Sequence, residues 1–254
     1  MLSGLTGLKA LIFPESGGCP LCGRQGTPDQ ICRFCLQVWA DLAKGLVPCA
    51  KCGRFHSGEE GEKICWECRE GEPRYIMARA VAPYEGPVRE AVHYFKFCGK
   101  RELAYPFGEL MAALIVQLFP FRTFSAVVPV PLHTNRLRER GYNQAALLAG
   151  VIARFLKIPL QEEALLRVRE TPSQTSLSRQ EREANVKKAF SAGKDALQLK
   201  GKRVLLVDDV YTTGATVKEC CQVLTSAGIG EVYVIALAAG DRKSTRLNSS
   251  HGYI

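Results

Sequence analysis

The stretch VLLVDDVYTTGATV occupies residues 204–217 and decides the fold that we expect. Four apolar residues run into Asp208 and Asp209, and a loop of threonines and glycine follows. The apolar run reads as a buried strand, and ATVKECCQVLTSAG (215–228) reads as the helix after it. This stretch therefore predicts a strand, a polar turn and a helix in direct succession.

Neighbouring segments repeat the alternation of strand and helix. AVVPVPL (126–132) precedes NQAALLAGVIARFL (143–156), and EVYVIALAA (231–239) follows the helix at 215–228. Strands that alternate with helices of this length form parallel sheets covered on both faces. We therefore predict an α/β fold with a parallel sheet and helices on both faces, in which ligands bind at the carboxyl ends of the strands.

The polar turn suits a sugar phosphate. Backbone N–H groups at a helix N-terminus attract a phosphate, Gly214 permits its close approach, and Thr212, Thr213 and Thr216 add hydroxyl donors. Two carboxylates would repel a phosphate, but each can accept a hydrogen bond from one of two vicinal sugar hydroxyls. The simpler alternative is a strand followed by a capped helix without a ligand, which needs neither two acids nor three threonines. The motif Gly-x-x-x-x-Gly-Lys-Ser/Thr of P-loop ATPases does not occur.

Eight of the eleven cysteines form four Cys-x-x-Cys pairs near the N-terminus. The pairs are Cys19/Cys22, Cys32/Cys35, Cys49/Cys52 and Cys65/Cys68. Tetrahedral zinc takes four thiolates, and two such pairs supply them without strain. We predict two consecutive zinc ribbons at 19–35 and 49–68, each with a short hairpin between its two pairs, and interleaved pairing remains the alternative. Disulfides need an oxidising compartment, and no export signal is recognisable.

The remaining cysteines and one histidine fall outside this pattern. We expect Cys98, Cys220 and Cys221 to be buried thiols and His56 to lie at the surface. Zinc ribbons bind nucleic acid, bind protein or stabilise a region too small for its own core, and we favour a structural or protein-docking module here.

Charge and hydropathy divide the chain into four parts. Residues 1–18 predict a short amphipathic helix without the features of a signal peptide, and 19–74 hold the double zinc ribbon. Residues 75–240 form the predicted α/β domain and carry a net charge of +7, so the basic character belongs to this domain. The tail 241–254 has no periodicity and reads as foreign read-through. No apolar run approaches the roughly 18 residues that span a bilayer, so we predict no integral membrane segment.

VLLVDDVYTTGATV resembles the phosphoribosyl pyrophosphate (PRPP) motif of type I phosphoribosyltransferases. The resemblance implies a type I phosphoribosyltransferase-like sheet and PRPP bound together with Mg²⁺. It implies that Asp208 and Asp209 bind the ribose hydroxyls. The 5′-phosphate would be bound by Thr212, Thr213, Gly214, Ala215 and Thr216.

Two further segments narrow the resemblance. VPVPLHTNRLRERGYNQA (128–145) and TPSQTSLSRQEREANVKKAF (171–190), together with the cysteine pairs, look like the ComF family of competence proteins. The family implies a cytoplasmic bacterial protein that aids uptake of transforming single-stranded DNA beside a partner DNA helicase. Peripheral contact with the inner face of the membrane is the alternative location.

The basic segments 136–140 and 179–188 are expected to follow the backbone of a DNA strand, and four basic residues are candidate contacts for pyrophosphate or DNA. They are Lys96, Arg136, Arg138 and Arg140. Guanidinium forks suit pyrophosphate oxygens, although a solvated charge is the simpler reading of each residue. Phe97 and Tyr142 are candidates for stacking on DNA bases. The polar segment 171–179, with Ser178 and Glu181 as a capping box for the next helix, reads as a mobile loop over the site or as a DNA contact.

Three functions remain open at this stage. We favour a DNA-uptake protein that retains a PRPP-binding site. The alternative is an active phosphoribosyltransferase, in which Mg²⁺ bridges the pyrophosphate and ribose hydroxyls while an unidentified nitrogen acceptor attacks C1′. A scaffold that docks a helicase through its zinc ribbons needs neither the acids nor the threonines.

Overall fold

A computed structural model describes residues 17–27, 29–57, 64–71, 73–120, 123–171 and 179–240. Three of the predicted features lie wholly or mostly outside these ranges. They are the helix at 1–18, the segment 171–179 with its capping residue Ser178, and the tail 241–254.

The chain forms eight described strands and eight described α-helices. The strands are β1 (Val47–Pro48), β2 (Phe55–His56), β3 (Met77–Pro83), β4 (Ala126–Pro129), β5 (Leu165–Arg167), β6 (Phe190–Ala192), β7 (Arg203–Tyr211) and β8 (Glu231–Ala239). The helices are α2 (Arg33–Leu42), α3 (Trp66–Glu70), α4 (Gly86–Phe97), α5 (Ala104–Leu118), α6 (Thr134–Arg140), α7 (Gln144–Leu156), α8 (Arg179–Val186) and α9 (Ala215–Ser226). Two 3₁₀ helices, η1 (Arg101–Leu103) and η4 (Lys194–Leu199), complete the described elements.

The central sheet has the order β3-β8-β7-β4, and all its neighbouring strands are parallel. This confirms the predicted parallel α/β fold, with the strand before Asp208 in the interior of the sheet. The edge strand β3 and the antiparallel β5–β6 pair were not predicted. Three of the seven residues of β3 are alanine and only Val81 is β-branched, so its sequence carries little of the β-branched character that marks strands.

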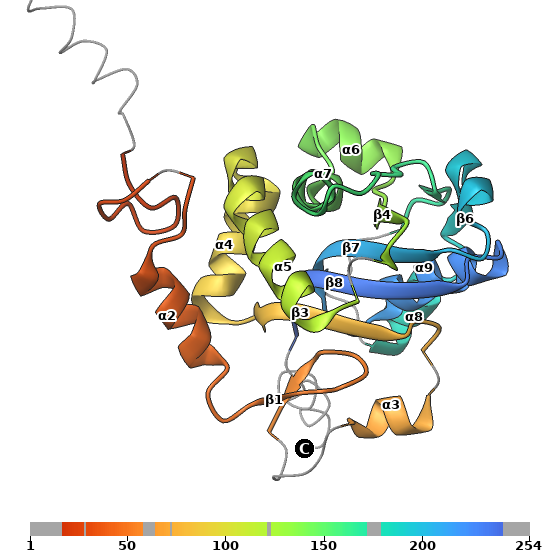
Figure 1. Ribbon diagram of the computed structural model, residues 1–254, viewed down its shortest axis with the longest axis horizontal. Coiled ribbons are helices and arrows are strands. Elements are labelled where there is room, and N and C mark those ends of the chain that lie inside the picture. The colour runs from red at the N-terminus through yellow and green to blue at the C-terminus, as the bar shows by residue number, and fades with distance from the viewer. Residues whose placement is uncertain are drawn as a thin grey trace, which may run out of the picture.

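Alternating side chains of β7 enter two separate cores. Val204 and Leu206 pack in a core with α9 and the β5–β6 pair, whereas Leu205 and Val207 pack in a core with α4, α5 and α7 (Figure 1). Because successive residues of a strand point to opposite faces, an apolar run with no polar interruption is what a strand covered on both faces requires.

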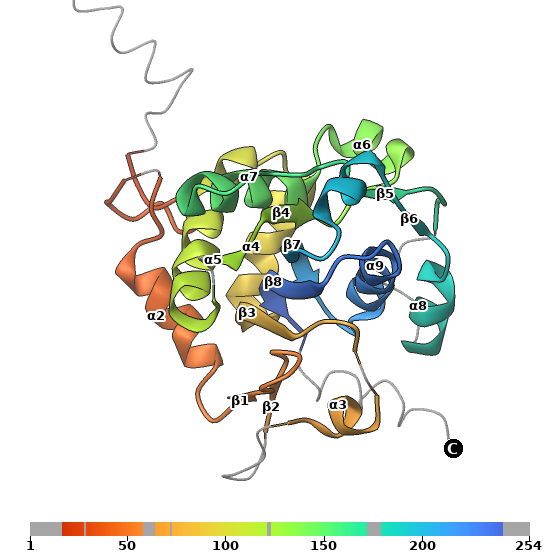
Figure 2. The same ribbon diagram turned by 45° about the vertical axis from the view of Figure 1, so that its right-hand side comes forward.

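Both cysteine modules pack against the sheet domain. In the first, Trp39 of α2 contacts Phe107 of α5 with ring centroids 5.8 Å apart. The second lies along the outer edge of β3, together with β1, β2 and α3 (Figure 2). There the N–H of Ala78 donates to the carbonyl of Lys51 at 2.8 Å. The module therefore covers a sheet edge that would otherwise expose unpaired backbone groups. The predicted domain boundary at residues 74/75 stays a prediction.

Candidate functional site

Two buried acids lie on β7 directly beyond the last residue that pairs with β4. β4 pairs with β7 as far as Pro129, which lies opposite Val207. Asp208 and Asp209 follow directly and are 9% and 8% exposed. They lie at the carboxyl end of an interior parallel strand, which is the place where ligands bind in such sheets.

The two carboxylates lie on opposite faces of β7. Asp209 faces α4, where the ammonium of Lys96 lies 2.9 Å from its Oδ1. Asp208 lies on the α9 side, and its Oδ1 accepts a hydrogen bond from the N–H of Asp209 at 2.9 Å. Burial, followed by the charge of Asp209, raises the pKa of Asp208 to about 7. The environment of Asp208 therefore favours its protonated form.

The turn after the acids has the backbone of a helix N-terminus. Gly214 caps α9 with φ 79°, a left-handed conformation that favours glycine. The hydroxyl of Thr213 accepts from the N–H of Ala215 at 3.4 Å. Thr212 and Thr216 are partly exposed, whereas Thr213 is buried. The first N–H groups of a helix have no partner within it, so this turn can offer donors to an anion.

A basic cavity of about 620 Å³ adjoins the acids. Among the described residues, its lining consists of Lys96, Phe97, Gly99, Arg136, Glu139, Arg140 and Tyr142. Lys96 belongs to this lining and also reaches Asp209, so it connects the cavity to the end of β7. The structure thus brings three of the four predicted basic contacts together. Arg138 is exposed and does not belong to the lining.

The two aromatic candidates have different surroundings. Tyr142 is buried and its hydroxyl donates to the carbonyl of Phe95, so the prediction that it stacks on bases is wrong. Phe97 is 61% exposed, and the guanidinium of Arg140 lies 4.8 Å from its ring centroid. Burial lowers the pKa of Arg140, although an arginine remains charged in proteins. Exposed Phe97 and partly buried Arg140 therefore form an aromatic and cationic pair at the rim of the cavity.

Arg167 on β5 is a cation near the site that the sequence did not reveal. It donates to the hydroxyl of Thr171 at 2.5 Å, and Arg136 donates to the carbonyl of the same residue at 2.7 Å. Burial and the charge of Arg136 lower the pKa of Arg167. Within the described part of the chain, its buried Nε has no hydrogen-bond partner. β5 has only three residues, so no periodic pattern pointed to this side chain.

The cysteines gather in two groups of four. Within each group the sulfur atoms lie within 4.8 Å of one another, and the groups are the consecutive ones that we favoured. The distances between sulfurs are 3.9 Å for Cys19 and Cys35 and 3.7 Å for Cys52 and Cys65. Four sulfurs about 2.3 Å from a tetrahedral zinc ion lie about 3.8 Å apart, so both groups fit zinc.

The local structure of each group differs from the predicted hairpin between pairs. In the second group, β1 and β2 flank the first pair, and α3 begins directly after Cys65. In the first group, α2 begins directly after Cys32. The N–H of Cys65 donates to Sγ of Cys49 at 3.3 Å, and the N–H of Cys32 donates to Sγ of Cys19 at 3.4 Å. Such bonds to sulfur stabilise a thiolate and help to hold a metal site.

The structure corrects two predictions about the remaining residues. His56 is 3% exposed, so the prediction of a surface position is wrong, and within the described residues its Nε2 has no hydrogen-bond partner. Cys98 is exposed and not a buried thiol, because it ends α4 at the rim of the cavity. Cys220 and Cys221 are buried in the core, as predicted.

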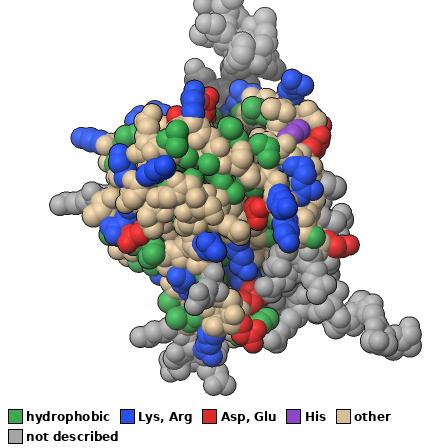
Figure 3. Space-filling view, turned by 90° about the vertical axis from the view of Figure 1, so that its right-hand side faces the viewer, with side chains coloured by type: hydrophobic (Ala, Val, Ile, Leu, Met, Phe, Trp, Pro, Cys, Tyr) green, Lys and Arg blue, Asp and Glu red, His purple; other side chains and the backbone are tan. Residues whose placement is uncertain are grey.

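The second predicted basic segment, 179–188, lies on the side of the molecule that carries α8 and α9. Several Lys and Arg side chains project from this side, among hydrophobic ones (Figure 3). Lys187 and Lys188 are exposed there. Within the described ranges, no helix has the length and apolar character needed to cross a membrane.

Comparisons with known proteins point to one family. The family model described as "Phosphoribosyl transferase domain" matches residues 143–254. Competence protein F of Haemophilus influenzae is 33% identical over 193 residues, which cover 74% of this chain and 83% of that protein. DNA utilization protein YhgH of Escherichia coli K12 is 33% identical over 226 residues, which cover 87% of this chain and 89% of that protein.

A solved structure adds a more distant likeness. The purine phosphoribosyltransferase of Pyrococcus horikoshii is 20% identical with a TM-score of 0.33, over 52% of this chain and 70% of that one. The family match runs through 241–254 as well. The interpretation of that tail as read-through stays a prediction.

Proposed function

This chain belongs to the ComF family of competence proteins, and from that membership we propose that it serves DNA uptake or use and binds PRPP at the carboxyl end of β7. The observation that supports the proposal is that three features lie together at the carboxyl end of β7. They are the buried pair Asp208 and Asp209, the turn led by Gly214, and the cavity lined by Lys96 and two arginines.

Each part of PRPP has a counterpart in this arrangement. The acids accept hydrogen bonds from the ribose hydroxyls, and the N–H groups at the start of α9 receive the 5′-phosphate. Arg136 and Arg140 are available to the pyrophosphate, for which guanidinium forks are suited. Carboxylate and phosphate oxygens are the ligands that Mg²⁺ prefers, so Asp208 and Asp209 fit an ion bound together with PRPP.

The ion pair of Lys96 has a role in this scheme. Without ligand, Lys96 neutralises Asp209 at 2.9 Å. When PRPP binds, its phosphates compete for this cation while its hydroxyls and Mg²⁺ compete for the carboxylate. The ion pair therefore compensates the charge of Asp209 beside Asp208, and PRPP with Mg²⁺ replaces it with ligand contacts to both partners.

Titration calorimetry of the zinc-loaded protein with PRPP and Mg²⁺ tests the proposal. We expect binding by the parent and none by Asp208→Asn/Asp209→Asn, which keeps the shape of both side chains and removes their charge. Glu90→Gln/Glu162→Gln is the matched control, because both of its acids are exposed. A double variant at the site that binds PRPP as the parent does would refute this assignment.

The nucleic acid that we propose is single-stranded DNA at the rim of the cavity. Exposed Phe97 offers a ring for stacking, and partly buried Arg140 beside it offers a charge for the phosphate backbone. We expect fluorescence anisotropy to show binding of a labelled oligonucleotide that weakens with salt. Phe97→Ala should weaken it about fivefold or more, since stacking on one aromatic side chain contributes about 1–3 kcal/mol per base.

Phe155→Ala is the control for this experiment, because Phe155 is also exposed but lies near the far end of α7. Equal affinities of the two variants would move the DNA surface elsewhere, first to 179–188. The protein partner that we propose is a DNA helicase of the competence machinery, docked on the cysteine modules. Co-purification of the helicase with the full chain, and its loss when exposed α2 residues such as Phe34 are changed, tests that contact.

The presence of both acids also supports a second candidate function, the transfer of ribose 5-phosphate from PRPP to a nitrogen acceptor. A protein that only binds PRPP leaves it whole, whereas a transferase releases pyrophosphate. A coupled pyrophosphate assay with a set of nucleobases and amines, run beside the double variant, separates the two.

A further inference from the structure

The second cysteine module contains a buried ion pair that joins its two cysteine pairs. Arg54 follows the Cys49/Cys52 pair, and Glu67 lies between Cys65 and Cys68. Their side chains form an ion pair with exposures of 9% and 11%. Each partner comes from one half of the metal-binding group, so the ion pair depends on the two halves being held together.

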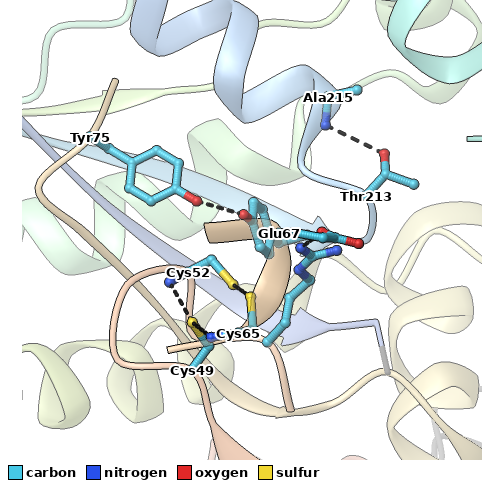
Figure 4. A network of polar contacts seen from close by, with 9 residues as sticks. Cys49, Cys52, Cys65, Glu67, Tyr75, Thr213 and Ala215 are labelled. Atoms are coloured by element: carbon cyan, nitrogen blue, oxygen red, sulfur yellow. Dashed lines mark hydrogen bonds and ion pairs between the residues drawn. The ribbon is translucent and has the colours of Figure 1, made fainter. Parts of the chain in front are cut away.

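The same arginine faces the strand that carries the candidate PRPP site. Its guanidinium lies 5.9 Å from the ring centroid of Tyr211, the last residue of β7. The hydroxyl of Tyr211 lies 2.8 Å from the hydroxyl of Tyr75, and both tyrosines are 3% exposed. Figure 4 shows Glu67 between the cysteine cluster and the turn at Thr213 and Ala215, with the hydroxyl of Tyr75 directed towards the same region from one side.

Tyr211 in turn fills the space beside the glycine of the phosphate turn. A Cβ atom on Gly214 would lie 2.8 Å from the Tyr211 hydroxyl and 2.9 Å from Cε2 of its ring. The tyrosine therefore limits where the backbone of Gly214 can lie, and with it the first N–H groups of α9. A chain of contacts leads from the cysteine group through Arg54 and Tyr211 to this turn.

The first cysteine module has no comparable position. Cys19, Cys35 and Trp39 belong to the core formed with α4 and α5, on the face of the sheet opposite to α9. Among the described contacts, none joins that module to Tyr211 or to Gly214. One molecule therefore contains a metal-binding group linked to the turn and a second group of the same chemistry that is not.

We propose that the metal-loaded group Cys49/Cys52/Cys65/Cys68 sets the position of the phosphate turn, with Arg54, Tyr75 and Tyr211 as positioning residues. This inference rests on the proposed PRPP site for its functional meaning. Loss of the metal frees the two cysteine pairs from a common centre, separates Arg54 from Glu67, and leaves Tyr211 without fixed support.

The test compares one exchanged ligand in each group. Cys68→Ser affects the second group and Cys22→Ser the first. Each of these cysteines is the most exposed of its group of four. Zinc content by mass spectrometry and circular dichroism establish that each variant lost one ion and kept its fold. Hydrogen exchange of peptides covering 207–217 is measured without ligand, and the affinity for PRPP with Mg²⁺ is measured separately.

We expect faster exchange in 207–217 and at least tenfold weaker PRPP binding for Cys68→Ser, with less than a twofold change for Cys22→Ser. Equal behaviour of the two variants in exchange overturns the inference. If the parent itself fails to bind PRPP, the proposed function fails, while the exchange data still decide whether the metal group positions the turn.

A second pair of variants covers the case in which Cys68→Ser does not fold. Tyr75→Phe and Tyr211→Phe each remove the same hydroxyl contact and keep the ring. We expect each single variant to weaken PRPP binding about threefold or more. The affinity of the double variant for PRPP should be no lower than that of the single variant with the lower affinity. If the losses of PRPP affinity multiply in the double variant, or if neither single variant loses affinity, the contact between Tyr75 and Tyr211 does not link the module to the turn.

Discussion

Lys96 at the end of α4 and Asp209 on β7 are joined by an ion pair of 2.9 Å, with side-chain exposures of 18% and 11%. This pair connects the basic cavity to the acidic strand end. It also explains how two adjacent acids coexist in a largely buried place, because a cation faces one of them. An ion pair that is mostly withdrawn from water is more sensitive to loss of one partner than a surface pair.

We predict that Lys96→Met lowers the free energy of unfolding by about 1–3 kcal/mol, because it leaves the Asp209 carboxylate without its partner. The same change should weaken PRPP binding about tenfold. Lys100→Met is the control, since the pair of Lys100 and Glu102 is exposed at 58% on both sides and should contribute less than about 1 kcal/mol. Urea titration and calorimetry measure both effects. Equal losses of stability in the two variants would contradict this account.

A second prediction concerns pH. The folded protein holds the proton of Asp208 up to about pH 7, whereas the ordinary pKa is 3.8. Between these values the folded state binds a proton that the unfolded state has released, so stability falls as pH rises from about 4 to about 7. Asp208→Asn removes this dependence and should be more stable than the parent at pH 8, by at most about 4 kcal/mol.

Urea titrations at several pH values check this, with Glu162→Gln, a change of an exposed acid, as the variant that keeps the parental slope. PRPP affinity of the parent should rise through pH 7, because the charged carboxylate is the better acceptor for hydroxyls and the better ligand for Mg²⁺. A stability difference between the parent and Asp208→Asn that stays constant from pH 4 to 7 would show that Asp208 titrates normally.

The sequence was informative where one local rule decides the structure. An uninterrupted apolar run predicted a strand covered on both faces, and four cysteine pairs predicted two groups of four. The sequence was less informative where a side chain depends on a distant neighbour. His56 is buried and Cys98 exposed because of elements that pack far apart in the chain, and Arg167 joins the site from a strand of three residues. Pair partners such as Lys96 and Asp209 are set by topology, which one sequence does not show.

A third prediction separates two neighbouring arginines of α6. Arg140 lines the cavity, whereas Arg138 is exposed and lies outside the lining. Arg140→Ala should weaken PRPP binding about tenfold, since a hydrogen bond to a charged group contributes about 1.5–3 kcal/mol. Arg138→Ala should change it less than twofold. Calorimetry of the two variants at one ionic strength is sufficient, and similar losses would mean that only the net charge of α6 matters.

The last prediction concerns two glycines that share a left-handed backbone. Gly201 has φ 68° and open space around it, whereas Gly214 has φ 79° and the Tyr211 ring against it. Gly201→Ala should cost about 1–2 kcal/mol of stability, which is the cost of that backbone for a residue with a Cβ. Gly214→Ala adds overpacking against Tyr211, typically about 1–3 kcal/mol more, and also displaces the turn.

Only Gly214→Ala should therefore abolish PRPP binding, although both variants strain the backbone in the same way. Thermal unfolding gives the stability difference, and calorimetry under conditions where both variants are folded gives the affinity. Combining Gly214→Ala with Tyr211→Leu, which removes the aromatic ring and its hydroxyl, should recover part of the stability that overpacking cost. A double variant as unstable as the sum of the two single ones would show that Tyr211 does not hold the turn.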